Sequence, residues 1–336
     1  MNRAVGGLAL LAASLAGLAG GCGAGADRSD PGLRDVRLAA VIKALDNPYF
    51  ATMRSGLVVA ARRSHARLDV AAARTGLEDT AGQAAQLESL AADRPRCYVV
   101  NPINETNLLP ALSRVGGNTP IVNVDSEVGT AAAKAVGVKI TTYVGIDNRA
   151  SGRLAADAMT RLVGRRARVA LITGIPGDRG SAVRAAGFAQ RARGRFTIVA
   201  TIAADFERGK ARLAAAHALR SDPHIAGFFA VNDVMALGVA DAVRAAGRQG
   251  AVKVVGFDGI RQALAAVGRG VLSATVAQYP FMIGRLGVEA CLAALRGRAV
   301  PARVDAPVQV ITRENVAQAQ ASYPNPAGRF ADPFTR

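Results

Sequence analysis

The feature that most constrains this chain is a regular alternation of short apolar runs with longer amphipathic stretches, which begins at residue 36. Short apolar runs bounded by turn residues are typical of buried strands, and the longer stretches are typical of helices. Such alternation indicates parallel sheets that are covered by helices on both faces. The predicted strands are Val36–Lys43, Leu68–Arg74, Cys97–Val100, Pro120–Val124, Arg168–Thr173, Phe196–Ala203, Gly227–Ala230, Val252–Gly256 and Ser273–Ala277.

The predicted helices lie between these strands along the chain. They are Phe50–Ser64, Ala81–Ala92, Ser151–Val163, Ser181–Ala192, Arg208–Leu219, Asp233–Ala246 and Pro280–Arg296. We expect the chain to leave the first sheet at Tyr143–Asp147, because the pattern restarts there with Asn148 as a helix cap. Further crossings are expected near Val276–Gln278 and Val304–Val310.

The number of strands favours two sheets, and three crossings would join them as a hinge. We therefore predict an α/β fold with two doubly wound parallel-sheet lobes and a three-segment hinge. The N-terminal lobe would contain residues 36–145 and 279–305, and the C-terminal lobe residues 146–278 and 306–320. Residues 321–336 include three Pro and are predicted to be a disordered tail.

The N-terminus has the composition of a secretory signal peptide. Arg3 precedes an apolar run from Ala4 to Ala19, and small residues then lead to Cys22. The run is too short and too rich in Gly for a transmembrane helix. We expect residues 1–22 to be a signal peptide with a lipidated Cys22, and residues 23–35 to be a flexible tether to the membrane. Ordinary signal cleavage nearby, with Cys22 lost or inert, is the alternative.

Two further cysteines, Cys97 and Cys291, both fall in the predicted N-terminal lobe. In an oxidising compartment they either form one disulfide or remain as two buried thiols, and the sequence leaves both alternatives open. Neither these cysteines nor His65, His217 and His224 have the spacing of a metal site. We therefore predict no metal and no cofactor.

The formal net charge of +17 raises the question of nucleic-acid binding. Only five of the 42 basic residues are Lys, and the Arg residues are scattered over many predicted helix faces. A coding bias toward Arg explains this distribution without a function, and an exported protein has little access to nucleic acid. We expect no nucleic-acid partner.

Polar and aromatic residues follow several predicted strands at the point where each strand ends. Ligands of parallel α/β sheets bind at these carboxyl ends. Each residue alone also has an ordinary explanation, since Asn and Asp cap helices, rings fill cores and arginine is common on surfaces. Their recurrence at the same edge in both halves favours a binding site. The candidates are Asn47, Tyr49, Phe50, Asp125, Ser126, Arg184, Phe206, Asn232, Asp258 and Gln278.

This collection of side chains suits a sugar. Adjacent sugar hydroxyls both donate and accept, so Asp, Asn, Gln and Arg satisfy them with directional hydrogen bonds. The C–H face of a pyranose ring packs on aromatic rings. An isomer with one inverted hydroxyl would leave a buried polar group unpaired, and this difference would give the site its specificity.

Five fragments in this order resemble the ribose-binding family of periplasmic sugar-binding proteins, and the resemblance runs from about Val36 to Val316. They are DNPYF at 46–50, ADFER at 204–208, NDVMALG at 232–238, VVGFDG at 254–259 and ATVAQYP at 274–280. The resemblance implies a type I periplasmic binding fold and sugar contacts from the candidates other than Ser126. Tyr49 stands where ribose binders have Phe, and Ser126 where they have an Arg that helps to coordinate the sugar. The ligand therefore stays open among pentoses, hexoses and polyols.

The resemblance also implies a monomeric protein that delivers a monosaccharide or polyol to the permease subunits of an ABC importer. A receptor that presents the sugar to a sensor kinase would have the same site and is the alternative. A sugar-acting enzyme is less favoured, because the sequence has no GxxxxGK[ST], HExxH or GxSxG motif. A repressor is disfavoured, because the predicted signal peptide stands where repressor relatives have a helix-turn-helix.

Overall fold

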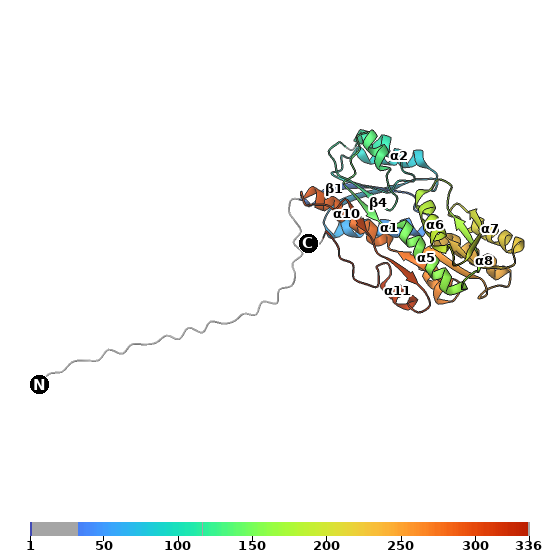
Figure 1. Cartoon of the computed structure of the whole chain (residues 1–336). Helices are drawn as coiled ribbons and strands as arrows, with labels where there is room; N and C mark the ends of the chain where they lie inside the picture. Colours follow the sequence, from blue (N-terminus) through green and yellow to red (C-terminus); the bar gives the residue numbers. More distant parts are fainter. Residues whose placement is uncertain (2–32, 116, 335–336) are drawn as a thin grey trace.

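The structure is a computed structural model that describes residues 33–115 and 117–334, together with Met1. The described residues form two six-stranded sheets that are flanked by helices (Figure 1). The strand order is β11-β5-β4-β3-β1-β2 in the first sheet and β12-β10-β9-β8-β6-β7 in the second. Neighbouring strands are parallel except for β10 and β12, which are antiparallel. This confirms the predicted α/β fold with two lobes.

The first lobe contains the first sheet and the helices that cover it. Its strands are β1 (Arg37–Ile42), β2 (Arg67–Ala72), β3 (Tyr98–Val100), β4 (Ile121–Val124), β5 (Thr142–Gly145) and β11 (Arg303–Asp305). Its helices are α1 (Pro48–Arg63), α2 (Thr80–Ala91), α3 (Leu109–Val115), α4 (Thr130–Ala135) and α10 (Pro280–Leu295).

The second lobe is built in the same way around the second sheet. Its strands are β6 (Arg168–Thr173), β7 (Thr197–Ala203), β8 (Ile225–Ala230), β9 (Lys253–Asp258), β10 (Ala274–Gln278) and β12 (Val308–Ile311). Its helices are α5 (Asn148–Val163), α6 (Arg179–Ala192), α7 (Arg208–Ser221), α8 (Asp233–Ala245), α9 (Arg261–Gly268) and α11 (Val316–Ser322).

The described chain passes between the lobes three times. It leaves the first sheet after β5, returns from β10 to α10, and leaves again between β11 and β12. These crossings lie where the sequence pattern predicted them, so the hinge has three segments. Each crossing follows the carboxyl end of a strand, and the two sheets therefore present these ends to one another.

Several short elements of the fold were not predicted, although the short strands β3 and β4 were. The helices α3, α4, α9 and α11 have only six to eight residues, and the strands β5, β11 and β12 have three or four. Two helical turns are too few for a periodic hydrophobic pattern to stand out from the surrounding loops.

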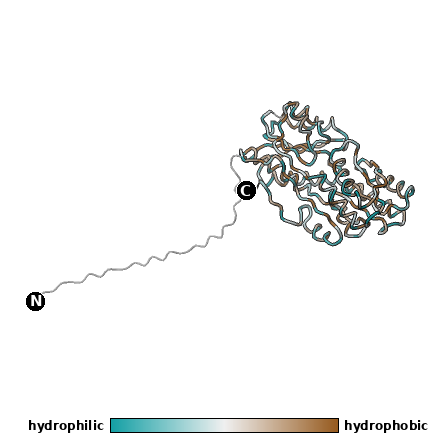
Figure 2. Tube along the Cα trace, viewed as in Figure 1, coloured by the Kyte–Doolittle hydropathy of each residue, from teal (hydrophilic) through white to brown (hydrophobic). Residues whose placement is uncertain are grey.

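Hydrophobic and hydrophilic segments alternate along the folded chain in both lobes (Figure 2). The central strands β1, β4 and β9 are buried along nearly their whole length, because helices cover both faces of each sheet. The edge strands β2 and β7 alternate between more and less exposed positions. The continuous apolar runs in the sequence are therefore the inner strands of each sheet.

The C-terminal tail packs against both lobes, which differs from the disorder predicted for residues 321–336. The Tyr323 hydroxyl lies 3.2 Å from Thr52 Oγ1 of α1, and the Arg261 guanidinium of α9 stacks on the Tyr323 ring at 4.4 Å. Asp332 pairs with Arg285 of α10 at 2.7 Å. The Pro residues prevent regular secondary structure here, but the aromatic and acidic side chains of the tail still contact helices of both lobes. Further packing on the core comes from Phe330 and Phe334.

The predicted signal peptide, Cys22 and most of the predicted tether lie outside the described residues. The described fold begins at Leu33, which is buried against the core, and the Asp35 N–H donates to the His65 carbonyl at 2.8 Å. The last three residues of the predicted tether are thus part of the first lobe. Across the described part of the chain, no helix combines the length and apolar content needed to cross a bilayer.

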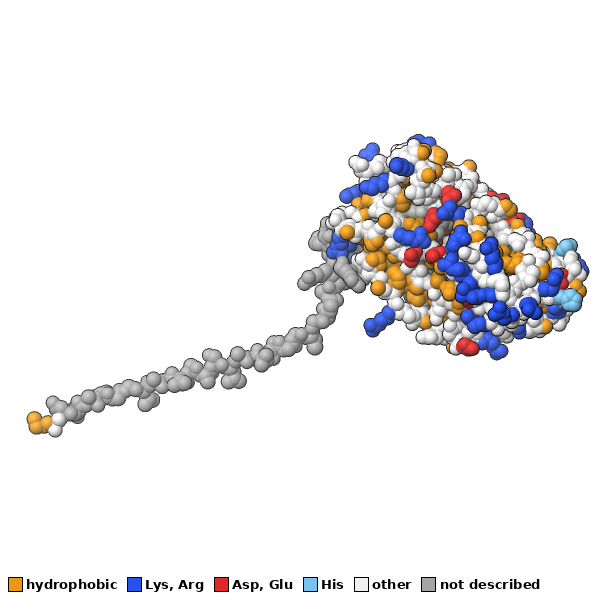
Figure 3. All heavy atoms as spheres, in the orientation of Figure 1, with side chains coloured by type: hydrophobic (Ala, Val, Ile, Leu, Met, Phe, Trp, Pro, Cys, Tyr) orange, Lys and Arg blue, Asp and Glu red, His pale blue; other side chains and the backbone are white. Residues whose placement is uncertain are grey.

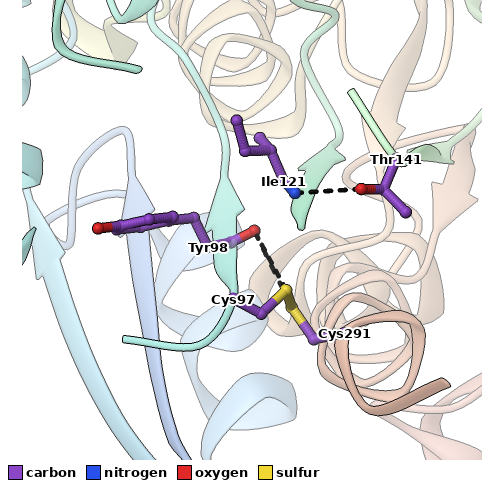
Figure 4. The surroundings of a disulfide bond; sticks show 5 residues. All are labelled: Cys97, Tyr98, Ile121, Thr141 and Cys291. Atoms are coloured by element: carbon purple, nitrogen blue, oxygen red, sulfur yellow. Dashed lines mark hydrogen bonds between the residues drawn. A yellow bond between two sulfur atoms is a disulfide. The ribbon is translucent and has the colours of Figure 1, made fainter. Parts of the chain in front are cut away.

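Cys97 and Cys291 form a disulfide, so the first of the two alternatives left open by the sequence holds (Figure 4). Cys97 immediately precedes β3, and Cys291 lies in α10, 194 residues further along the chain. Both side chains are fully buried. The bond fastens α10, which returns from the second lobe, to the centre of the first sheet.

Replacing both cysteines, as in Cys97→Ala with Cys291→Ala, should lower the free energy of unfolding by about 2–5 kcal/mol. The reason is that the bond closes a long loop and so restricts the unfolded chain. Urea denaturation under oxidising conditions measures the difference. With a reductant present, the wild type should approach the stability of the variant, and equal stability of the two under oxidising conditions would contradict this account.

Candidate functional site

A cavity of about 340 Å³ lies between the lobes, where the carboxyl ends of strands from both sheets meet. Its volume falls at the small end of the range for small-molecule pockets. The structure brings all ten residues that the sequence singled out to its wall. They are Asn47, Tyr49, Phe50, Asp125, Ser126, Arg184, Phe206, Asn232, Asp258 and Gln278.

Two asparagines on the wall are also helix caps. The Asn47 Oδ1 accepts the Tyr49 N–H at 2.9 Å at the start of α1, and the Asn232 Oδ1 accepts the Met235 N–H at 2.9 Å at the start of α8. Both residues therefore cap helices, which is the alternative explanation that the sequence offers for them. It does not remove them from the site, because the cap uses only the carbonyl oxygen of each amide.

Aromatic side chains reach the cavity from both lobes. The Tyr49 and Phe50 rings at the start of α1 meet edge to face, with their centroids 5.1 Å apart. The Phe206 ring follows β7 and lies over Gly174, where an added Cβ would come within 2.1 Å of the ring. Only Gly leaves room for this ring position.

Three wall residues have left-handed backbone conformations that residues other than Gly rarely adopt. The φ angles are 61° at Asp125, 63° at Phe206 and 119° at Asp258. They lie at or just beyond the ends of β4, β7 and β9. Strained residues of this kind persist only where the surrounding structure holds them, and they cluster at functional sites.

Arg184 is buried in the wall by close packing of α5 and α6. A Cβ on Gly152 of α5 would lie 2.1 Å from the Arg184 carbonyl oxygen, so a larger residue would push the helices apart. The guanidinium stacks on the Phe257 ring at 3.6 Å and donates to Asn148 Oδ1 at 2.7 and 3.1 Å and to the Val231 carbonyl. These contacts hold the arginine in one orientation at the cavity.

A chain of hydrogen bonds crosses the cavity from one lobe to the other. The Tyr49 hydroxyl lies 2.7 Å from Asp125 Oδ1 and 3.0 Å from Gln278 Oε1. The Gln278 Nε2 in turn donates to Asp258 Oδ1 at 2.7 Å. Tyr49 and Asp125 belong to the first lobe, and Gln278 and Asp258 end strands of the second. The chain therefore joins the lobes through three buried side chains and the half-buried Asp125.

Burial controls the protonation of these groups. It raises the pKa of Asp258 to about 7, and the Asp125 charge adds to this increase, although Arg184 and the hydrogen bond from Gln278 act against it. Burial, followed by the charges of Asp125 and Asp258, also holds the pKa of Tyr49 well above its usual range. Tyr49 is therefore a neutral phenol that donates one hydrogen bond.

A fully buried carboxyl group supports the wall from behind. Asp233 accepts hydrogen bonds from the Ile260 N–H at 3.0 Å and from Thr275 Oγ1 at 2.7 Å. Its contacts fix the turn that follows Asp258. Burial, with the charge of Asp258, raises the pKa of Asp233 as well.

A buried ion pair joins the lobes at one side of the cavity. Lys43 follows β1, and its Nζ lies 3.2 Å from Oδ2 of Asp178, which caps α6. The two side chains are 8% and 13% exposed. Burial acts against the ionised form of Asp178, but Lys43 and the hydrogen bond from the Ser181 N–H outweigh it and lower its pKa. Both groups are therefore charged.

A second, more exposed set of ion pairs lies at the mouth of the cleft. Arg179 of α6 reaches Glu105 at 2.9 Å and Glu127 at 3.4 Å, both in the first lobe. On the face drawn in Figure 3, acidic and basic side chains lie side by side where the lobes meet. Exposed pairs of this kind contribute about 0–1 kcal/mol each, so they add little to the stability of the contact between the lobes.

The sequence analysis missed several polar residues of the wall. They are Lys43, Glu78, Thr80, Asn104, Asn148, Asp178 and Ser181. Asn148 was predicted to cap α5, but Asp147 is the cap: its Oδ1 accepts the Ala150 N–H at 2.8 Å. Asn148 is the next residue and holds Arg184 instead. Lys43 carried a usable signal, because a charged residue at the end of an apolar strand is unusual. Within the described ranges, no three His, Cys, Asp or Glu side chains are grouped as metal ligands.

The sequence of this chain matches a known family model over residues 38–299, which is more than half of its length. The model is described as a periplasmic binding protein domain. The chain belongs to this family. The family agrees with the resemblance found in the sequence fragments and with the two-lobe fold.

Relatives with known ligands agree with this assignment. A ribose import binding protein from Bacillus subtilis is 29% identical over 84% of this chain and 88% of its own length. A D-allose-binding periplasmic protein from Escherichia coli is 31% identical over 78% of this chain and 86% of its own. A solved ABC transporter periplasmic solute binding protein from Actinobacillus succinogenes, with bound D-allose, has a TM-score of 0.80 and 30% identity. That match covers 84% of this chain and 99% of the solved one.

The substitution Asp258→Asn should reduce the dependence of stability on pH. A carboxyl group whose pKa rises from 3.8 to about 7 on folding holds its proton more tightly in the folded state. Its contribution to the free energy of unfolding is complete below about pH 4 and is lost as the pH rises through about 7. Between pH 5 and 8, urea denaturation should show the wild type losing about 1–3 kcal/mol more than the variant. Parallel curves for the two proteins would rule out this assignment.

Proposed function

We propose that this protein captures one monosaccharide or polyol in the cavity between its lobes and delivers it to an ABC importer. The observation that carries the proposal is the wall of that cavity, which combines directional hydrogen-bonding groups with aromatic rings from both lobes. The relatives described above are binding proteins for ribose and D-allose. Their names agree with the expectation of a binding protein rather than an enzyme.

The wall has the groups that an enclosed sugar requires. Phe50 and Phe206 come from opposite lobes and would pack on the C–H faces of the ring. Arg184, Asn232 and Asp258 would donate to and accept from its hydroxyls. The small volume of about 340 Å³ suits a single ring better than an oligosaccharide.

Closure of the lobes would couple binding to transport. Only the closed arrangement brings both halves of the wall to the ligand. A ligand bound to one lobe therefore favours the closed state, because it gains contacts with the other lobe there. The three-segment hinge permits this movement without breaking either sheet. The permease would then recognise the spacing of the outer surfaces in the closed protein.

We also propose how the protein is located. The basic start, the apolar run and the small residues before Cys22 support export through a signal peptide, with the lipidated cysteine as the membrane anchor. The disulfide between Cys97 and Cys291 agrees with an oxidising compartment. The folded part would act as a monomer with no nucleic-acid partner.

The substitution Asp258→Ala should weaken sugar binding by about 2–5 kcal/mol, because it removes a buried charged group from the wall. A thermal-shift screen over pentoses, hexoses and polyols first identifies the ligand, and calorimetry then gives its affinity. The control is His217→Ala on the exposed face of α7, which should leave the affinity unchanged. A change below threefold for Asp258→Ala would count against this role.

Loss of the buried inter-lobe ion pair should open the protein. In Lys43→Met, Asp178 would remain buried without its cation, which costs about 3 kcal/mol or more and lowers the apparent affinity about 100-fold. The matched control, Arg179→Gln, removes only exposed pairs and should change the affinity less than about fivefold.

Small-angle scattering should show compaction of the wild type on addition of ligand. Unchanged dimensions at saturation would contradict closure.

A further inference from the structure

The wall around Tyr49 is rich in hydrogen-bond acceptors and poor in donors. The single hydroxyl hydrogen of Tyr49 lies between two acceptors, Asp125 Oδ1 at 2.7 Å and Gln278 Oε1 at 3.0 Å. The Gln278 amide already donates to Asp258, and the Ser126 hydroxyl lies 3.4 Å from Asp125 Oδ2. At any moment at least one of these oxygens has no hydrogen, so this part of the wall requires donors from the ligand.

The charge of Arg184 acts on Asp258, but the Asp125 carboxyl group in the same part of the wall has no cation paired with it in the part of the chain that is described. Among the residues that the structure describes, no Lys or Arg forms an ion pair with Asp125 or Asp258. The two cations of the wall are engaged elsewhere, Lys43 with Asp178 and Arg184 with Asn148 and a backbone carbonyl. Asp125 is half-buried and faces the cavity, and a ligand that encloses its carboxylate away from water incurs a cost unless it brings a positive charge.

We propose that the ligand carries a protonated amine, as in an amino sugar or an amino polyol, and that this ammonium group lies against Asp125 and the Tyr49 hydroxyl. An ammonium group offers three donors and no acceptor, together with one positive charge, which is what this part of the wall lacks. A neutral hydroxyl supplies one donor, adds another acceptor and brings no charge. The proposal rests on the proposed function and names the ligand class within it.

Ser126 determines this charge balance, because its hydroxyl is neutral and supplies no cation beside Asp125. Its side chain is also short. A neighbouring cavity of about 480 Å³ shares Asp125 and Ser126 with the first one. An arginine side chain introduced at position 126 has room to extend there, so the missing charge can be supplied from the protein itself.

Matched pairs of ligands test the proposal at pH 6.5, where the amines are mostly protonated. The pairs are D-glucosamine with D-glucose, D-galactosamine with D-galactose, and an amino-inositol with the corresponding inositol. N-acetyl-D-glucosamine serves as a substituted but uncharged comparison. Calorimetry should give an affinity at least tenfold higher for the amino member of the pair that fits the pocket, and no such gain for the acetylated sugar.

Two variants test whether Asp125 is the origin of the preference. Asp125→Asn keeps the shape and removes the charge, and Ser126→Arg supplies a cation from the protein. Both should lower the ratio of amino-sugar to neutral-sugar affinity from tenfold or more to about one. The control is Asp69→Asn on the exposed edge strand β2, which makes the same chemical change far from the cavity and should keep the ratio of the wild type.

The outcomes separate the proposal from the function on which it rests. A neutral sugar that binds as tightly as its amino partner, or tighter, would overturn the amine proposal and leave the sugar-binding function standing. An amine preference that persists in both variants would also overturn it, because the charge of Asp125 would not be its cause. Failure of every sugar, amino sugar and polyol to bind would remove the proposed function itself.

Discussion

The constraint on which the rest of the structure depends is that the two sheets face one another with the carboxyl ends of their strands. A parallel strand ends in a loop, and the loop residues are the first positions at which polar side chains can lie outside the apolar core. Three crossings hold the two sets of loops opposite each other. The cavity is therefore lined by residues as far apart in the chain as Lys43 and Gln278, and none of them needs to leave its own lobe to reach it.

This arrangement requires the backbone to turn sharply at the strand ends. Asp125, Phe206 and Asp258 all adopt left-handed conformations there, at a cost of about 1–3 kcal/mol each. The surrounding contacts offset that cost, for example through Asp233, which accepts the backbone N–H that follows the turn at Asp258. Asp125, Phe206 and Asp258 all lie on the wall of the cavity.

The sequence predicted the inner strands and the wall residues well for one reason. A strand that is buried on both faces appears in the sequence as a continuous apolar run. The first polar residue after the run marks the end of the strand, as at Asp125 and Asp258. What the sequence could not predict depends on contacts between distant segments. The pairing of Lys43 with Asp178 exists only when the lobes meet, and the packing of Tyr323 on α1 and α9 gives no periodic signal. The roles of the wall residues toward a ligand stay predictions.

The charges in the cavity connect ligand binding with closure. Where the lobes meet, Asp258 is buried and Asp125 is half-buried, and they receive hydrogen bonds from the Gln278 amide and the Tyr49 hydroxyl. Burial raises the pKa of Asp258 although the charge of Arg184 acts against it. Lys43 and Asp178 attract one another across the lobes, whereas burial between the lobes acts against the ionised form of Asp258. Under the proposed closure, a ligand that supplies donors to the two carboxyl groups would remove this cost and leave the ion pair to act. The proposed balance between open and closed states would then respond to the hydrogen bonding and charge of the ligand as well as to its shape.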